Sequence, residues 1–498
     1  MRKKATVDRF ACWLAALLLS AAGLAAAALE APLADAAEER DGAAIRALLK
    51  QGFDVNAAQV DGMTALHWAS YRDDRDAAKM LIDAGARVDA ANRYSVTPLS
   101  LAAVNGSGSM IELLLGSGAD SNTSLPGGET VLMTAARTGK LEAVQALLRG
   151  GADVHHKEER RGQTALMWAA AEGHAEVLQA LIDAGADFRT RLESGLTPFL
   201  FAVREGRLEA AKVLLAAGED VNQVAEPGED APKRSPRAGT SALLLAASNG
   251  HFELASMLLD SGADPTAEIP GYSVLHAMAS VRNPGVGDND PPPEGSGAMS
   301  SLEFVAKLAA AGADLNARTS KNIRLGNTRL NKLGATPFLL AAHTADVALM
   351  SKLAELGADP LAPNAENTTP LMAASGVGTR SPGEDAGTEE EVVEALRLAL
   401  QLGADIDAVD DNGETAMHGA AYKNAPAAVE FLAKAGAKID VWNQNNSYGW
   451  TPLIIATGYR FGNFKPSSPT IAAIREAMLA AGVAPPEKPE PAKSQEIY

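Results

Sequence analysis

Histidine, cysteine and clustered carboxylates build most catalytic and metal sites, and this chain of 498 residues holds only eight histidines and one cysteine. His155 and His156 are adjacent, and imidazoles are common ligands of Zn²⁺. We find no carboxylate or thiol at the ligand spacing that would complete such a site. The sequence therefore predicts neither a bound metal nor a cofactor.

Other signatures of catalysis are also missing from the sequence. It contains no Gly-x-x-x-x-Gly-Lys, no Gly-x-Ser-x-Gly and no His-Glu-x-x-His. His67, His276 and His418 instead recur at one place, three residues after a threonine or serine, and His174 and His251 each follow a glycine. Such regular placement indicates a structural repeat, so we predict no catalytic residue and no enzymatic activity.

A short phrase beginning with threonine recurs at a period near 33 residues. A fixed period of this size is typical of stacked units, none of which can bury its apolar face alone. The first five copies are Thr64-Ala-Leu-His67, Thr97-Pro98-Leu99-Ser100, Thr130-Val-Leu-Met133, Thr164-Ala-Leu-Met167 and Thr197-Pro198-Phe199-Leu200.

Each period predicts two helices and a hairpin. The threonine hydroxyl can cap a first helix, and the proline that often follows it suits the first helical position. Apolar residues at helical spacing follow, for example Ala77, Met80, Leu81 and Ala84. About twenty residues after the threonine, a Gly-Ala pair such as Gly85-Ala86 ends the second helix. Asp and Asn then favour a tight turn that leads to the next threonine.

These features resemble the ankyrin repeat, whose signature is Thr-Pro-Leu-His-x-Ala with a Gly-Ala-Asp loop. We trace eleven repeats over residues 61–483 and a degenerate capping half-repeat over 31–60, where Ile45, Leu48 and Leu49 keep only a second helix. The resemblance implies an all-α solenoid of about twelve helix-turn-helix-hairpin units. Ser100, Met133 and Leu200 replace the histidine in some repeats. The threonine–histidine hydrogen bonding of the family is therefore expected to be incomplete, with apolar packing compensating.

The N-terminus resembles an export signal. Basic residues precede an apolar stretch over 10–24, and four alanines at 25–28 offer cleavage sites. The alternative is an uncleaved membrane anchor, since residues 10–29 approach spanning length. We favour a cleaved signal over residues 1–28, which also removes the only cysteine, Cys12. The chain then resembles bacterial exported ankyrin proteins and is expected in the periplasm or outside the cell, without a membrane segment.

The net charge excludes two classes of binding partner, and the composition of the C-terminus predicts its local structure. The formal net charge of −18 argues against nucleic acid and anionic lipid, both of which bind basic surfaces. Residues 484–498, rich in proline and charge, predict a disordered tail. Nothing in the sequence requires a second copy of the chain, and we expect a monomer.

Five insertions interrupt the repeats, at 223–239, 283–300, 317–335, 376–390 and 461–469. Three of them, at 283–300, 376–390 and 461–469, fall between the two helices of a repeat, and loops on one side of a scaffold often carry binding. The alternative is that surface loops merely tolerate insertion. Residues 317–335 hold several basic residues and no acid. This segment either grips an acidic partner or folds back onto the chain's own repeats, and we favour the self-contact.

By analogy with the family, we expect the chain to bind a protein in a concave groove between first helices and hairpin fingers. The resemblance places Tyr71, Arg137 and Arg204 near first-helix ends. It places Trp168, which follows the histidine slot, beside the concave groove, although we favour packing between neighbouring first helices for this residue. Hairpin tips supply Arg93, Tyr94, Arg160, Arg161 and Glu193, and the basic segment supplies Arg324 and Arg329. Two alternatives stay open: a protective or chaperone-like accessory of an envelope enzyme that handles peroxide or haem, and a secreted effector that acts on a host or competitor protein.

Overall fold

The computed structural model describes residues 31–269, 271–285, 293–322, 328–459 and 465–491. The predicted signal at 1–28 and the last residues of the predicted tail lie outside these ranges. Two compact units form, one from residues up to 168 together with 179–186, the other from 169–178 together with 187 onward. Within the described ranges no helix is both long and apolar enough to cross a bilayer.

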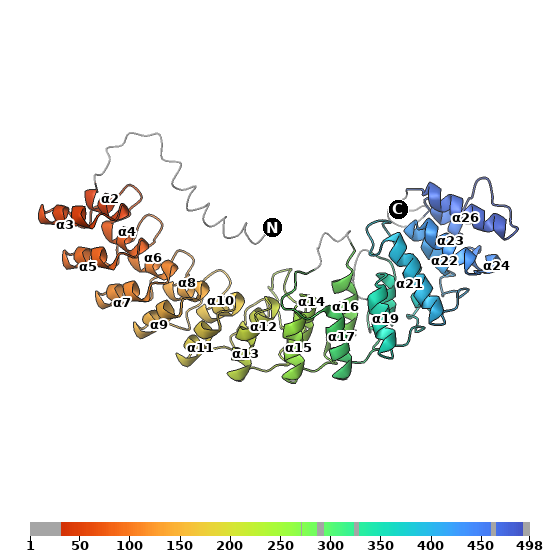
Figure 1. The fold of residues 1–498 in the computed structure, drawn as a ribbon, viewed down its shortest axis with the longest axis horizontal. Coiled ribbons are helices and arrows are strands. Elements are labelled where there is room, and N and C mark those ends of the chain that lie inside the picture. The colour runs from red at the N-terminus through yellow and green to blue at the C-terminus, as the bar shows by residue number, and fades with distance from the viewer. Residues whose placement is uncertain (1–30, 270, 286–292, 323–327, 460–464, 492–498) are drawn as a thin grey trace. The chain divides into compact units, whose positions relative to one another are not determined.

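The predicted all-α fold is confirmed (Figure 1). Among the described residues, the helices other than the four-residue α24 form twelve pairs, and a two-stranded ribbon is the only sheet. Residues up to 186 contain α2 (Pro32–Glu38), α3 (Gly42–Lys50), α4 (Ala65–Tyr71), α5 (Arg75–Asp83), α6 (Pro98–Asn105), α7 (Gly108–Gly116), α8 (Val131–Thr138), α9 (Leu141–Arg149), α10 (Ala165–Glu172) and α11 (Ala175–Asp183).

The remaining pairs belong to the second unit, where the ribbon precedes α16. They comprise α12 (Pro198–Arg204), α13 (Leu208–Ala216), α14 (Ala242–Ser248), α15 (Phe252–Asp260), β1 (Glu268–Ile269), β2 (Tyr272–Ser273), α16 (Val274–Arg282), α17 (Ser301–Ala310), α18 (Pro337–His343), α19 (Val347–Glu355), α20 (Pro370–Ser375), α21 (Glu389–Gln401), α22 (Ala416–Lys423), α23 (Pro426–Lys434), α24 (Ile439–Trp442), α25 (Pro452–Ala456) and α26 (Ser468–Ala480).

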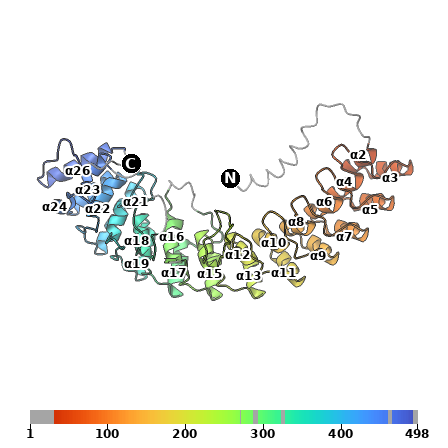
Figure 2. The same ribbon diagram turned by 180° about the vertical axis from the view of Figure 1, so that it is seen from behind.

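Within each unit the first helices lie in one row and the second helices in another, as both views show (Figures 1 and 2). Contacts run between neighbours, for example α4 with α6 and α5 with α7, and between the two helices of a pair. The residue two places after the repeat threonine is buried between the rows, as Leu66, Leu99 and Phe338 illustrate. Burying one such side chain stabilises by about 1.5–3 kcal/mol, so the stacking itself creates the core.

The repeat threonine, or serine at Ser241 and Ser273, stands at the N-cap of the first helices after α2, as the sequence predicts. Thr97 and Thr336 accept hydrogen bonds from backbone N–H groups three residues on, and proline occupies the first turn after each. Where histidine is present it extends the cap to the next repeat. In His67, Nδ1 accepts from the Thr64 backbone N–H at 3.1 Å, so Nε2 carries the proton and donates to the Val96 carbonyl at 3.0 Å.

These histidines are held neutral. Burial lowers the pKa of His67, and it lowers the pKa of His276 and of His418 to about 4, against weaker opposing effects of backbone carbonyls. The Nε2 atoms of His276 and His418 bond the carbonyls of Ala335 and Gln444. Their role is therefore structural, joining a helix cap to the hairpin of the following repeat.

The Asp and Asn residues after each Gly-Ala pair connect neighbouring repeats. In the loop after α7, Asp120 accepts from the Asn122 N–H, which closes a local turn, and the Asn122 side chain accepts from the Asp153 N–H of the next loop at 2.8 Å. Equivalent bonds join Asn56 to the Arg87 N–H and Asp89 to the Asp120 N–H. We call this series the loop ladder, and it recurs in the second unit at Asn222, Asn316 and Asp407.

A second series connects the hairpin tips. The Arg93 N–H donates to the Asp61 carbonyl, and the Glu159 N–H donates to the Gly127 carbonyl. In the second unit, Ala365 and Ser447 donate in the same way to Leu333 and Asn412. Every hairpin with such a bond is therefore fixed by its predecessor.

The N-terminal end differs from the sequence expectation. Residues 31–60 were predicted to keep only a second helix, but α2 precedes α3 and packs on α4, so the pair is complete. This first helix lacks the repeat threonine, and Ala31 at its cap makes no side-chain hydrogen bond.

The insertions lie between helices. Residues 223–239 and 317–335 precede the first helices α14 and α18. The segments 283–300, 376–390 and 461–469 fall between the two helices of a pair, except that the last two residues of 376–390 and of 461–469 already belong to α21 and α26. In the predicted tail, the carbonyls of Pro486 and Glu487 accept hydrogen bonds from Arg475.

The loop ladder predicts that Asn122→Ala lowers the free energy of unfolding by about 0.5–1 kcal/mol, because the exposed Asp153 N–H loses its partner and bonds water instead. Urea unfolding followed by circular dichroism measures this change. Asp83→Ala is the control, since its pair with Lys79 is exposed and contributes little. Equal effects of the two substitutions would contradict the ladder's role.

Candidate binding surface

Cation–aromatic clusters mark the ends of first helices in the first unit. Tyr71, the last residue of α4, is 41% exposed and meets Trp68 edge-on at 5.9 Å between ring centroids. The Arg72 guanidinium lies 5.5 Å from the Tyr71 ring. Arg137, in the last turn of α8, lies over the Trp168 ring at 4.8 Å and pairs with Glu129. Tyr71 and Arg137 thus lie in the last turns of their helices, while Trp168, the fourth residue of α10, corresponds to Trp68 and is half-buried.

The hairpin tips of this unit present exposed residues on a fixed backbone. Arg93 and Tyr94 are exposed between α5 and α6, Tyr94 at 51%, and Arg160 and Arg161 are exposed between α9 and α10. The buried Glu158 side chain accepts hydrogen bonds from the Arg160 and Arg161 N–H groups, both at 2.7 Å. Burial alone would raise the pKa of Glu158, but these donors and the Gln163 N–H lower it below its usual range. The carboxylate therefore holds the tip in shape while both arginine side chains point outward.

Two of the predicted residues in the second unit, Glu193 and Arg204, flank the insertion at 223–239. Glu193 is an exposed hairpin residue whose carbonyl accepts from the Gly228 N–H. Arg204 ends α12, pairs with Glu205 at 2.8 Å and lies over the Phe201 ring. Arg204 also lines a cleft of about 340 Å³ against α14, together with Arg234 and Arg237 of the insertion.

The basic segment at 317–335 contacts the chain's own repeats, as the favoured alternative expects. Arg318 donates to the Pro363 carbonyl, and the Arg329 N–H donates to the Gly378 carbonyl at 2.7 Å. The Arg329 guanidinium bonds the Tyr448 hydroxyl and lies 5.7 Å from that ring. Lys332 is buried. Arg324 lies outside the described residues.

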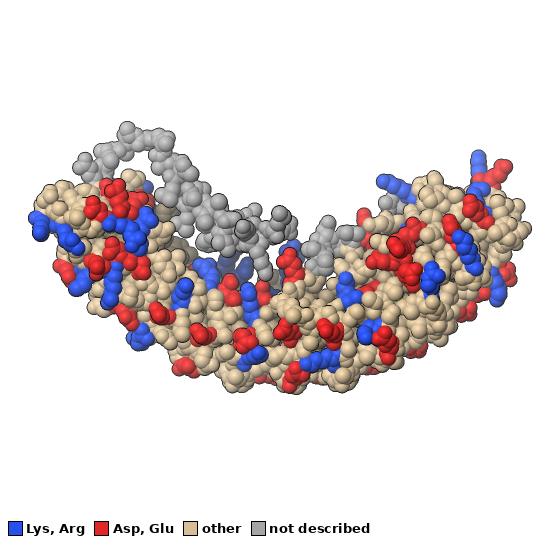
Figure 3. Space-filling view, viewed as in Figure 1, with Lys and Arg blue, Asp and Glu red and all other residues tan. Residues whose placement is uncertain are grey.

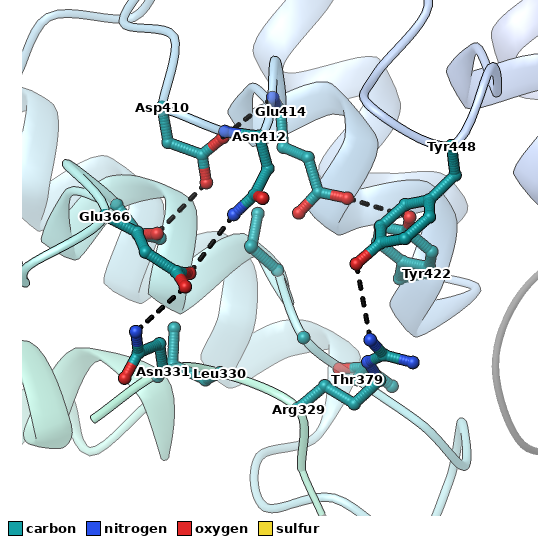
Figure 4. A pocket seen from close by; sticks show the side chains of 13 residues that line it. Arg329, Leu330, Asn331, Glu366, Thr379, Asp410, Asn412, Glu414, Tyr422 and Tyr448 are labelled. Atoms are coloured by element: carbon teal, nitrogen blue, oxygen red, sulfur yellow. Dashed lines mark hydrogen bonds between the residues drawn. The ribbon is translucent and has the colours of Figure 1, made fainter. Parts of the chain in front are cut away.

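Arg329 stands at a small polar pocket of about 120 Å³, drawn in Figure 4. Its walls come from the basic segment, from the hairpins before α20, α22 and α25, from the start of the insertion after α20 and from α22 itself. Asn331 and Asn412 donate to the two carboxylate oxygens of Glu366 at 2.8 and 3.1 Å. Asp410 accepts from the Thr368 hydroxyl at 3.0 Å. These bonds tie successive hairpins together.

Glu414 is the most perturbed carboxyl in this pocket. Its Oε1 accepts from the Tyr422 hydroxyl at 2.8 Å and from the Asn446 amide at 3.0 Å. Burial, helped by the nearby Asp410, raises the pKa of Glu414 to about 7, against the lowering effect of those donors and Arg329. Burial likewise raises the pKa of Asp410 and that of Tyr422. The carboxyl groups of the pocket find their hydrogen-bond partners within the chain, so we interpret the pocket as a structural contact between hairpins.

The sequence did not reveal this pocket or the arginines of the cleft as a site. Arg234 and Arg237 were recognised only as part of an insertion. Glu414 directly precedes a repeat threonine, but Glu129 and Gln163 hold the same place in other repeats, so a polar residue there does not by itself mark a pocket.

Charge is mixed rather than segregated on the surface. Acidic and basic side chains intermingle over both units on the face drawn in Figure 3. Among the described residues, no group of three or more His, Cys, Asp and Glu side chains is arranged to hold a metal ion. What the surface offers is a series of aromatic and arginine contacts carried by rigid repeats.

A family model for ankyrin repeats, built on three copies, matches residues 33–125, 99–191, 132–225, 189–269 and 386–465, which together cover more than half of the chain. No curated protein matches the sequence.

The perturbed carboxyl predicts a pH-dependent stability. Because the folded-state pKa of Glu414 lies above its unfolded value of 4.5, its contribution is retained in full below pH 4.5 and is lost as the pH rises through about 7. Glu414→Gln removes this ionisation, so we expect it to gain roughly 3 kcal/mol relative to the parent at pH 8 and to differ little near pH 5.

Urea unfolding of both proteins at the two pH values measures the difference. Glu390→Gln, an exposed change of the same charge on α21, is the matched control and should show no such pH dependence. A Glu414→Gln protein that is no more stable than the parent at pH 8 would contradict the proposed burial penalty.

Proposed function

Since the chain belongs to the ankyrin-repeat family, we propose that it is a non-enzymatic scaffold that holds a protein partner against its first-helix ends and hairpin tips. Ankyrin repeats generally mediate protein–protein interaction, and proteins built from them typically lack catalysis of their own. What this particular chain adds is the set of side chains that would make the contact.

The observation that carries the proposal is the hairpin surface of the first unit. Arg93, Arg160 and Arg161 are exposed and form no ion pair with another described residue, and Tyr94, next to Arg93 in its hairpin, is half exposed. Tyrosine and arginine are the residues most often found as energetic centres of interfaces. Their backbones are fixed by Glu158 and by the bonds between hairpins, so little backbone ordering is required on binding.

The chemistry of these tips favours a partner surface with acidic and apolar groups. Arginine binds carboxylates through paired N–H donors, and tyrosine buries an apolar ring while its hydroxyl stays hydrated. Contacts spread over several rigid repeats would give the partner a large, extended footprint. We therefore expect a folded protein rather than a small molecule as the occupant.

Charge reversal at Arg160 and Arg161 to Glu tests this proposal. We expect capture of the partner, measured by crosslinking in intact cells and mass spectrometry, to fall about tenfold or more, because two contacts become repulsive. The melting temperature should stay unchanged, since both side chains are exposed.

Arg46→Glu with Lys50→Glu is the matched control, because it makes the same charge change on the exposed face of the second helix α3. A photo-crosslinking amino acid at Tyr94, compared with one at Lys79 on α5, would locate the contact independently. Equal capture by all of these proteins would remove the hairpin tips from the interface.

Export is part of the same proposal, and it is supported by the basic start, apolar stretch and alanines over residues 1–28. The expected product is a monomer without cysteine in the periplasm or outside the cell. N-terminal sequencing of the protein from fractionated cells should find a start near residue 29. Recovery of intact chain in the membrane fraction would instead support the anchor.

A further inference from the structure

The cleft against α14 differs from the hairpin tips in both shape and charge. Its floor is apolar, formed by Leu244 and Leu245 of α14 and by Ile269 and Tyr272 of the ribbon. Its rim carries Arg204, Arg234 and Arg237. A volume of about 340 Å³ is sufficient for a bulky side chain with its adjoining backbone.

We propose that this cleft docks an acidic peptide segment of the partner, with an apolar side chain on the floor and neighbouring carboxylates on the arginines. The inference deepens the proposed function and rests on it, because it assigns a chemistry to one part of the scaffold's partner.

Two of the rim arginines have no internal counter-charge. Arg234 and Arg237 are exposed and form no ion pair with any other residue in the described part of the chain. Arg204 pairs with Glu205, but its guanidinium stays about one-third exposed. In a chain of net charge −18, three arginines around one apolar cleft form a local exception. Such a combination complements a carboxylate next to an apolar group.

The insertion that supplies these arginines is held in place. The Ala225 N–H donates to the Thr240 carbonyl at 2.8 Å, and the Gly239 N–H donates to the Ala225 carbonyl at 2.9 Å. The Thr240 hydroxyl donates to the Arg237 carbonyl, and the Ser235 N–H donates to the Pro232 carbonyl. The backbone that carries Arg234 and Arg237 is therefore ordered before a ligand arrives, which reduces the entropy cost of binding.

The preceding hairpin supports the insertion from its other side. The Arg191 guanidinium donates to the Val224 carbonyl at 2.8 Å and pairs with Glu226. Gly195, at φ 81°, makes room for the insertion, since a Cβ there would lie 2.5 Å from the Pro227 nitrogen. These contacts hold the lengthened hairpin in place as one wall of the cleft.

The same features select among anionic ligands. A long polyanion such as a nucleic acid would extend beyond the cleft, where the net negative charge of the protein repels its phosphates. It would also leave the floor of Leu245 and Tyr272 without an apolar partner. A short peptide that joins one apolar side chain to one or two carboxylates satisfies both the floor and the rim.

Selection from a random dodecapeptide library displayed on phage, with the full-length protein as bait, tests the proposal. We expect enrichment of peptides that place Asp or Glu within two positions of Leu, Ile, Phe or Trp. The enriched peptides, synthesised with a fluorescein label, should lose about tenfold or more in affinity by anisotropy on Arg234→Glu with Arg237→Glu, because charge-assisted contacts become repulsive. Ile269→Thr should weaken binding of these peptides several-fold, because it removes part of the apolar floor of the cleft.

Arg46→Glu with Lys50→Glu again provides the matched control and should bind the peptides as the parent does. Absence of enrichment, enrichment of neutral or basic peptides, or unchanged affinity in the Arg234 and Arg237 variant would each overturn the inference. Partner capture that depends on Arg160 and Arg161 but not on Arg234 and Arg237 would leave the scaffold function standing and remove only the cleft.

Discussion

A repeat of this chain can satisfy its buried polar groups only with the help of its neighbour along the stack. The cap histidines bond carbonyls of the following repeat, and the loop side chains accept N–H groups of the following loop. The apolar face of each helix pair is covered in the same way, by the next pair. Stability is then a sum of interfaces between neighbours, and a single repeat has no core of its own. This constraint explains why a rigid surface can be assembled from units that are individually too small to fold.

The sequence predicted most of this architecture, because the same physical requirement recurs at a fixed spacing. Each threonine caps a helix and each Gly-Ala pair ends one, so the period alone placed most of the helix pairs. The exception is α2, which begins at Pro32 without the capping threonine and is recognisable only through its packing on α4. Terminal repeats lose the pattern because one of their faces has no neighbour to match.

The candidate surfaces were less predictable than the fold. Arg204 and the hairpin tips follow from their place within the repeat, since a tip has nothing of its own to bury. The cleft depends on an insertion, and its arginines acquire a shared role only when Arg234 and Arg237 lie above Leu245 and Tyr272. The pocket at Glu414 combines loop residues from five separate segments with Tyr422 of α22, and none of them stands out in the sequence. Long-range proximity of this kind has no periodic signal.

The hydrogen bonds of the loop ladder all have the same donor-to-acceptor direction along the chain. At every step the acceptor is a side chain and the donor is the main chain of the repeat that follows, as at Asn56 and Arg87 or at Asp407 and Lys438. Shortening the protein from its start would therefore leave a loop amide without its side-chain acceptor, whereas shortening it from its end would leave a loop side chain without its donor and a cap histidine such as His67 without the carbonyl that it bonds. The two operations are not equivalent, because they leave different groups without a hydrogen-bond partner.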